Sequence, residues 1–225
     1  MPASVDASTG AASVEVVTFA GFPEVALDFY DDLELDNTKS FWSAHKHVYE
    51  GAVRAPMQDL LTALEPQFGP AKVFRPYRDV RFAKDKTPYK THQGGFCAVG
   101  ESSGWYIQLD ARGAHVSAGT YAASAQARAA FREAVDSPRG AHLERLLGEL
   151  LGAGWTREGE QLKTRPRGCD PEHPRLELMR HNSLYVSFDY GFAPVVHSAD
   201  LLPRVREDWE SARPLVEWLA DATRV

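Results

Sequence analysis

Three short runs of apolar and aromatic residues in the middle of the chain constrain the fold more than any other feature. They cover residues 94–99, 105–109 and 114–121, and the two gaps between them are polar and contain glycine. Short runs separated by glycine-containing turns are typical of strands joined by hairpins. Because a hairpin places successive strands side by side in opposite directions, these runs predict an antiparallel meander.

Segments of helical periodicity flank this meander on both sides. Apolar residues recur at spacings of three and four over 23–34, 38–53, 57–68, 124–135, 140–151 and 201–222, with a kink or break predicted at Pro56 and at Pro214. Further strands are predicted after Lys72, over 159–163 and over 184–190. The sequence therefore predicts an α+β protein, in which an antiparallel sheet of about five to six strands packs with N-terminal, middle and C-terminal helices.

Length, charge and cysteine content limit the context in which the chain works. Its 225 residues favour a single α+β domain over 15–225, preceded by an Ala/Ser-rich tail over 1–14 that we expect to be disordered. Cys97 and Cys169 show no metal-binding or disulfide spacing, which favours a reduced, cytoplasmic location. No apolar run approaches the ~20 residues that span a bilayer, so no membrane partner is expected. The net charge of −6 disfavours nucleic-acid binding.

One basic segment stands out in this acidic chain. Residues 72–90 contain seven Lys and Arg residues and two acids, a local charge of +5. If the segment is extended, Arg75, Tyr77, Asp79 and Arg81 share one face, and Arg78 lies on the other. Guanidinium groups suit bidentate contacts with phosphate or carboxylate, and lysines add charge. The segment is therefore predicted to bind a small anionic ligand.

The predicted ligand-binding residues come from three parts of the chain. The segment 75–90 contributes Arg75, Tyr77, Arg78, Asp79, Arg81, Lys84, Lys86, Tyr89 and Lys90; Asn37 is a predicted orienting donor; and the proline-bounded stretch 163–175 contributes Arg165, Arg167 and His173. Loops held on a scaffold often supply such residues. The alternative for the last stretch is a plain connecting loop.

Motifs for catalysis, metals and cofactors are missing. Neither a nucleophile motif nor a glycine-rich phosphate loop occurs, and the eight histidines show no zinc-binding spacing. Metal binding is therefore not expected, no cofactor is indicated, and the sequence leaves open whether the chain is an enzyme. It also carries no indication of the oligomeric state.

Several motifs resemble one known family. Phe74-Arg75, Arg78-Asp79-Val80-Arg81-Phe82 and Lys84-Asp85-Lys86-Thr87-Pro88-Tyr89-Lys90-Thr91 resemble the signature of the family catalogued as domain of unknown function 2461, as do Asp36-Asn37 with Phe41-Trp42 and Arg165-Pro166-Arg167-Gly168. The resemblance runs over about residues 19–222. It departs from the family pattern at Asp36, where an asparagine is expected, and in the order of Phe41-Trp42. The resemblance implies one domain and an important basic segment, but no activity.

Three functional hypotheses follow from the sequence. The first is binding, with or without turnover, of a phosphorylated or carboxylated small molecule at segment 75–90. The second is an interaction module that docks an acidic protein or a nucleic-acid backbone. The third is a structural role, in which each arginine of the segment is paired with an internal acid.

Overall fold

A six-stranded antiparallel sheet forms the centre of the protein in a computed structural model, which describes residues 18–81, 84–121 and 123–224. The strands are β1 (Ala71–Val73), β2 (His92–Val99), β3 (Ser103–Asp110), β4 (Gly113–Thr120), β5 (Thr156–Glu158) and β6 (Leu184–Gly191), in the order β1-β2-β3-β4-β6-β5. The predicted α+β class and antiparallel meander are confirmed. The predicted tail over 1–14 lies outside the described residues, and the single domain stays a prediction.

Helices precede, interrupt and follow the sheet, as predicted. They are α1 (Val25–Leu35), α2 (Lys39–Val48), the π-helix η1 (Tyr49–Arg54), α3 (Ala55–Phe68), α4 (Ala125–Asp136), α5 (Arg139–Gly152), α6 (Leu176–Met179), the 3-10 helix η2 (Pro194–His197) and α7 (Leu201–Ala222). Thr38 caps α2 by accepting a hydrogen bond from the Phe41 N–H, and Ser124 caps α4 in the same way from Ala127.

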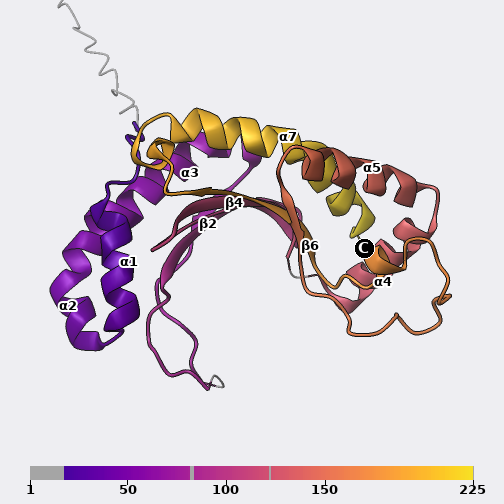
Figure 1. The fold of residues 1–225 in the computed structure, drawn as a ribbon, viewed down its shortest axis with the longest axis horizontal. Coiled ribbons are helices and arrows are strands. Elements are labelled where there is room, and N and C mark those ends of the chain that lie inside the picture. The colour runs from indigo at the N-terminus through magenta and orange to yellow at the C-terminus, as the bar shows by residue number, and fades with distance from the viewer. Residues whose placement is uncertain (1–17, 82–83, 122, 225) are drawn as a thin grey trace, which may run out of the picture.

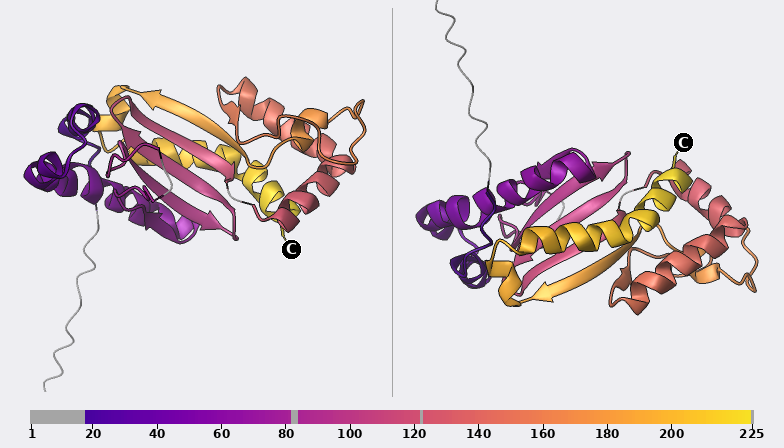
Figure 2. Two further views of the ribbon diagram at one scale, coloured as in Figure 1. Left: turned by 90° about the horizontal axis from the view of Figure 1, so that it is seen from below. Right: turned by 90° about the horizontal axis from the view of Figure 1, so that it is seen from above.

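The two faces of the sheet differ in chemistry because side chains alternate along each strand. One face carries buried apolar residues, among them Trp105, Ile107, Val116 and Val186. This face is convex, and α3 and α7 cover it (Figure 1). Figure 2 shows α7 lying along the sheet on that side. The hydrophobic core therefore lies between the convex face and these helices.

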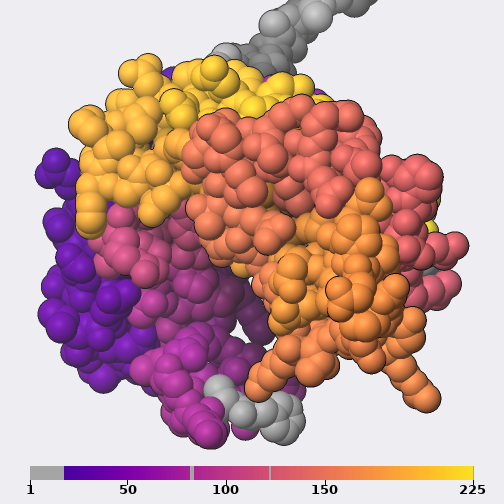
Figure 3. All heavy atoms as spheres, turned by 45° about the vertical axis from the view of Figure 1, so that its right-hand side comes forward, coloured from indigo at the N-terminus to yellow at the C-terminus, as the bar shows by residue number. Residues whose placement is uncertain are grey.

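No helix of the described residues packs over the concave face (Figure 1). The segment between β1 and β2 extends below one side of the sheet, and the segment between β5 and β6 extends below the other. These two connections flank the concave face on opposite sides, and the hollow between them, with the sheet as its floor, is called the trough (Figure 3). The fold therefore places the predicted basic segment along one side of this trough.

The break predicted at Pro214 and the strand predicted at 159–163 are corrected by the structure, and of the kink or break predicted at Pro56 the break is absent. Pro214 lies inside a continuous α7, since Trp209, Leu215 and Val216 around it are fully buried and their packing outweighs the ~3 kcal/mol cost of an internal proline. Near Pro56 the chain stays helical, with the π-helix leading directly into α3. The strand predicted at 159–163 instead lies at 156–158, where the chain pairs with β6.

Candidate functional site

The concave face holds a cavity of about 860 Å³. Its walls are side chains from all strands except β1, together with Phe74 and the turns next to β3 and β4. The space-filling view shows a hollow between the purple residues around β2 and the orange residues of the connection between β5 and β6 (Figure 3). Small-molecule pockets commonly enclose about 300–1,000 Å³, so this cavity has the size of a ligand site.

Aromatic rings form a continuous surface along part of the cavity. Tyr106 lies with its ring centroid 6.3 Å from that of Phe74 and 6.2 Å from that of Tyr121. Tyr121 in turn lies 5.6 Å from Phe96 and stacks on Tyr185 at 4.9 Å. These distances are those of ordinary aromatic pairs, which gain stability from offset or edge contacts. The ring surface is therefore preformed.

Two glycines create the space that these rings occupy. A Cβ atom on Gly94 would lie 2.6 Å from the hydroxyl oxygen of Tyr106, which is on the neighbouring strand β3. On Gly104, a Cβ atom would lie 2.5 Å from the Phe96 ring and 2.2 Å from a backbone oxygen. Glycine within a strand often marks a close approach of this kind. The sequence thus provides the rings and the space for them on neighbouring strands.

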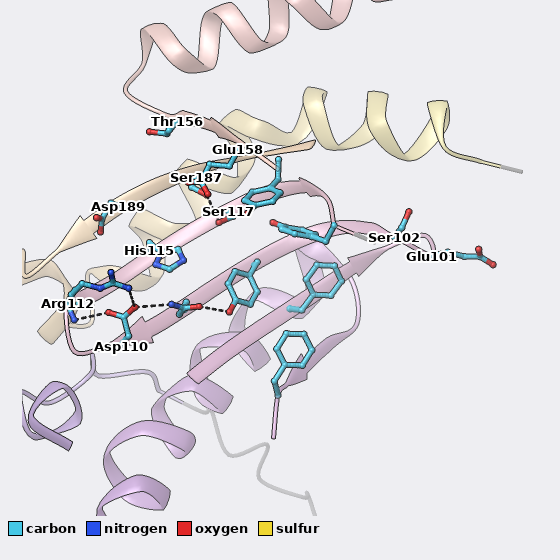
Figure 4. A pocket seen from close by; sticks show the side chains of 17 residues that line it. Glu101, Ser102, Asp110, Arg112, His115, Ser117, Thr156, Glu158, Ser187 and Asp189 are labelled. Carbon is cyan, nitrogen blue, oxygen red and sulfur yellow. Dashed lines mark hydrogen bonds and ion pairs between the residues drawn. The ribbon is translucent and has the colours of Figure 1, made fainter. Parts of the chain in front are cut away.

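A directed chain of hydrogen bonds forms the polar end of the cavity (Figure 4). The Tyr106 hydroxyl donates to Oε1 of Gln108 at 2.8 Å, and Nε2 of Gln108 donates to Oδ2 of Asp110 at 2.9 Å. Arg112 completes the chain, because its backbone N–H donates to Asp110 at 2.8 Å and its guanidinium at 3.2 Å. The residues 106, 108 and 110 alternate along β3, which places all three on the concave face.

Burial and hydrogen bonding determine the charges at this end. Burial alone would raise the pKa of Asp110, but the hydrogen bonds from Arg112 and Gln108 outweigh it and hold the pKa below its ordinary value. Burial lowers the pKa of His115, which projects from β4 (Figure 4), and also that of His92 on β2. At neutral pH the site therefore holds an ionised carboxylate beside neutral imidazoles.

Three predicted cations of the basic segment make bonds within that segment. Arg81 donates to both carboxylate oxygens of Asp79, at 2.9 and 2.6 Å. Arg78 contacts the carboxylate of Asp85, and Lys86 donates to a main-chain carbonyl of the segment at 2.9 Å. Both ion pairs are largely exposed to solvent, so each contributes little to stability. The positive charges of Arg78 and Arg81 are nevertheless partly neutralised by the neighbouring acids.

The predicted hydrogen-bond donors of this region hold the basic segment against the N-terminal helices. Asn37 pairs with the backbone of Tyr89 through both of its polar side-chain atoms. The Tyr89 ring stacks on Trp42, with centroids 4.2 Å apart and planes 7° apart. Tyr77 lies beside both rings and is half exposed. These contacts anchor the base of the segment to α2.

Three predicted cations have no acid within ion-pair distance among the described residues: Arg75, Lys84 and Lys90. Of these, Lys90 is placed close to the cavity, since its ammonium group is 5.5 Å from the ring centroid of Phe74, a wall residue. Lys72 lies over the same ring at 5.9 Å. Burial, with a smaller contribution from Arg75, lowers the pKa of Lys90. The structure thus brings one predicted residue to the cavity rim.

The predicted residues of the second loop do not join the basic segment. Arg165 and Arg167 are exposed and make no ion pair with a residue described in the structure. His173 bonds to Asp136 at the end of α4, at 3.0 Å. In Figure 1 this region lies on the far side of the trough from segment 75–90.

The residues of the cavity floor were missed by the sequence reading. A usable signal was present, because Tyr106, Gln108 and Asp110 occupy every second position of a strand whose other positions are apolar. His115 and Ser117 repeat the pattern on the next strand. Polar and aromatic groups at alternate positions indicate a face that no helix covers.

Comparison with known proteins places the chain in a family. Residues 25–218 match the family described as "Conserved hypothetical protein (DUF2461)". The chain belongs to this family. The resemblance drawn from the motifs is therefore confirmed, and membership in the DUF2461 family covers nearly the whole chain. A search of curated proteins finds no match.

The structure describes the 18–81, 84–121 and 123–224 ranges. Within these ranges, no group of three or more His, Cys, Asp or Glu side chains is arranged to hold a metal ion. None of their helices combines the length and the apolar character needed to cross a bilayer.

Proposed function

We propose that the chain binds a small organic molecule in the cavity on the concave face of the sheet. The observation that carries this proposal is a cavity of about 860 Å³ that combines a preformed aromatic surface with an ordered polar chain. Binding sites for small molecules commonly pair an apolar wall with a few well-placed polar groups. This proposal assigns binding and specifies no reaction.

The directed hydrogen bonds define what the polar end offers a ligand. Ionised Asp110 can only accept, so it orients the Gln108 amide, and that amide in turn fixes the Tyr106 hydroxyl as a donor to Gln108. The lone pairs of the Tyr106 oxygen and the second N–H of Gln108 then face the ligand. His115, neutral at pH 7, adds one donor and one acceptor. This set suits ligands with hydroxyl, amide or carbonyl groups.

A thermal-shift screen with a metabolite collection tests the proposal. A true ligand stabilises the folded state by about 2.7 kcal/mol at a hundredfold excess over its dissociation constant. Tyr106→Phe removes one hydroxyl at the cavity and should weaken binding about three- to tenfold, the value of one hydrogen bond. Tyr77→Phe removes a half-exposed hydroxyl outside the cavity and is the matched control. Equal affinity of both variants would place the ligand elsewhere and refute the proposal.

The anionic ligand predicted from the sequence is a second candidate, favoured by the position of Lys90. Its ammonium group lies at the rim, beside Phe74 and without an acid partner among the described residues. Phosphorylated and carboxylated compounds should then bind more weakly to Lys90→Met than to the wild-type protein. Lys84→Met, in an exposed part of the same segment, removes the same charge away from the cavity. Equal affinity of the two variants for such compounds would rule out an anionic ligand at this position.

The predicted interaction module remains an alternative proposal. Docking of an acidic protein or of a nucleic-acid backbone on segment 75–90 should weaken steeply as salt concentration rises. Fluorescence anisotropy with a polyglutamate peptide and with duplex DNA, at low and at physiological salt, measures this. Undetectable binding at low salt would exclude the alternative.

The cytoplasmic location also stays a prediction, which fractionation of cells would test.

A further inference from the structure

The walls of the cavity are acidic. Four carboxylates and one guanidinium line it, and the guanidinium of Arg112 is already paired with Asp110. The other three carboxylates, Glu101, Glu158 and Asp189, form no ion pair within the described part of the chain. With His115 neutral, the lining has a formal charge of −3. The basic segment contributes no Lys or Arg to the lining itself.

One of these carboxylates lies against the aromatic surface. Glu158 on β5 is the direct cross-strand partner of Tyr185 on β6, and both side chains face the cavity. Burial, followed by the negative charge of Glu158, raises the pKa of Tyr185. The Tyr185 ring stacks on Tyr121 at 4.9 Å. A carboxylate thus stands beside a stacked pair of phenol rings at one place in the cavity.

The Tyr121 hydroxyl supplies an independent indication of a ligand. Its oxygen is buried and forms no hydrogen bond of ordinary geometry with a described residue, although Ser117 lies next to it. The Ser117 hydroxyl is paired with Ser187 at 2.8 Å. A buried hydroxyl without a partner is costly, so a group that enters the cavity and accepts or donates a hydrogen bond there would stabilise it.

We propose that the ligand of this cavity carries a positively charged nitrogen, an organic ammonium group, which binds against Tyr121 and Tyr185 beside Glu158. This inference rests on the proposed small-molecule site and specifies the charge of its ligand. The negative faces of aromatic rings attract cations, and ammonium ligands are bound in this way. The neighbouring carboxylate of Glu158, on an exposed strand, adds a charge interaction of about 1 kcal/mol at close approach in water.

An organic cation fits these walls better than a metal ion or an anion. The three carboxylates without an ion pair come from separate elements, and no three metal-binding side chains converge within the described ranges. An anion at Glu158 would face a like charge. An organic ammonium ion loses its hydration more readily against aromatic rings and needs only one carboxylate beside it.

Choline and its uncharged isostere 3,3-dimethylbutan-1-ol provide a matched pair of probes. They have the same shape and differ in one positive charge, so calorimetric titration of the full chain with each isolates the effect of that charge. We expect choline to bind roughly tenfold more tightly. Glu158→Gln should reduce choline affinity about three- to tenfold and leave the isostere unaffected. Glu133→Gln, on the exposed side of α4, removes the same charge away from the cavity and should change neither.

The outcomes separate this inference from the proposed function. If both probes bind equally, or if choline binds Glu158→Gln and Glu133→Gln with equal affinity, the cation site is wrong. A neutral or anionic metabolite that binds the wild-type protein and loses affinity in Tyr106→Phe would still support the small-molecule site. If neither probe binds and no metabolite shifts the melting temperature, both ideas fall.

Discussion

Asn37 holds Tyr89 in place through a pair of hydrogen bonds: its Nδ2 donates to the Tyr89 carbonyl at 3.0 Å, and its Oδ1 accepts from the Tyr89 N–H at 3.1 Å. The two residues are 52 positions apart. The pair joins the turn before α2 to the end of the basic segment, and so holds the basic segment against the N-terminal helices. A residue predicted to orient a ligand is thus engaged in shaping the site.

Asn37→Ala should weaken the attachment of the basic segment to the N-terminal helices. Two backbone groups of Tyr89 lose their partner, and we expect the free energy of unfolding to fall by about 1–3 kcal/mol. Amide exchange of residues 77–90 should accelerate. Urea denaturation and hydrogen-exchange mass spectrometry measure the two effects. Asp36→Ala changes an exposed neighbour whose side chain forms no hydrogen bond or ion pair with a described residue, and it should leave both unchanged. Equal effects of the two substitutions would contradict the assignment.

Replacing Asp110 by asparagine should destabilise the protein in a pH-dependent way. The pKa of Asp110 is lower in the folded state than in the unfolded chain, so its charge stabilises the fold above the unfolded value of about 3.9. That stabilisation is lost as the pH falls through the lower pKa that Asp110 has in the folded state. Asp110→Asn should cost on the order of 1 kcal/mol at pH 7 and less at pH 3. An equal cost at both pH values in urea denaturation would show that the charge is unimportant.

The neutral histidines should make the stability of the protein depend on pH closer to neutrality. Burial lowers the pKa values of His92, His115 and His181 in the folded state. Below the unfolded value of about 6.5 the unfolded chain binds more protons, so stability should decrease as pH falls from 7 towards 5. His115→Gln should flatten this slope, whereas His47→Gln, on the exposed side of α2, should not. NMR titration midpoints at or above 6.5 would refute the assignment.

Asp85 should titrate at an unusually low pH. The N–H of Thr87 and then the guanidinium of Arg78 bond to its carboxylate and lower the pKa of Asp85 to about 2. Arg78→Met removes the second contribution and should move the pKa part of the way back towards about 3.9. Lys84→Met removes a neighbouring charge that makes no bond to Asp85 and should have a smaller effect. Carbon-detected NMR of the carboxyl groups gives the values, and an unchanged midpoint in Arg78→Met would contradict the ion pair.

Two glycine-to-alanine changes should have opposite signs. A Cβ atom on Gly104 would lie 2.2 Å from the Cys97 carbonyl oxygen, so Gly104→Ala must move two paired strands and should cost about 1–3 kcal/mol. Gly148 lies within α5, and apart from the local backbone of that helix no atom comes within 4 Å of its would-be Cβ, so Gly148→Ala should stabilise by about 0.5–1 kcal/mol. Thermal and urea unfolding measure both. A stabilising Gly104→Ala would mean that the strands approach less closely.

The sheet could be predicted from the sequence because its signals are local. The runs around Phe96, Ile107 and Val116 alternate at strand periodicity and are joined by short turns, so neighbouring strands are also neighbours in sequence. The helices were predictable for the same reason. Pro214 was misread, because the packing of Trp209 and Leu215 that keeps α7 continuous involves distant parts of the chain.

The basic segment stays a predicted binding site, and pairing of its arginines with internal acids was one of the alternatives that the sequence left open. Composition alone counts Arg78 and Arg81 as positive charge, whereas backbone geometry brings Asp85 and Asp79 to them. The face of the sheet that carries the cavity was also missed. A strand pattern shows that two faces differ, but it does not show which of them a helix will cover.

The sequence by itself determined the class of the fold, the order of its elements and the family, because each depends on residues close together along the chain or on a motif read directly. Only the tertiary structure decided where a ligand could bind. Tyr106, Tyr121 and Tyr185 meet on one surface, with Glu158 beside them, because β3, β4, β6 and β5 are paired side by side. Strand pairing across about 80 residues depends on the folded chain as a whole, and the local spacing of residues does not predict it.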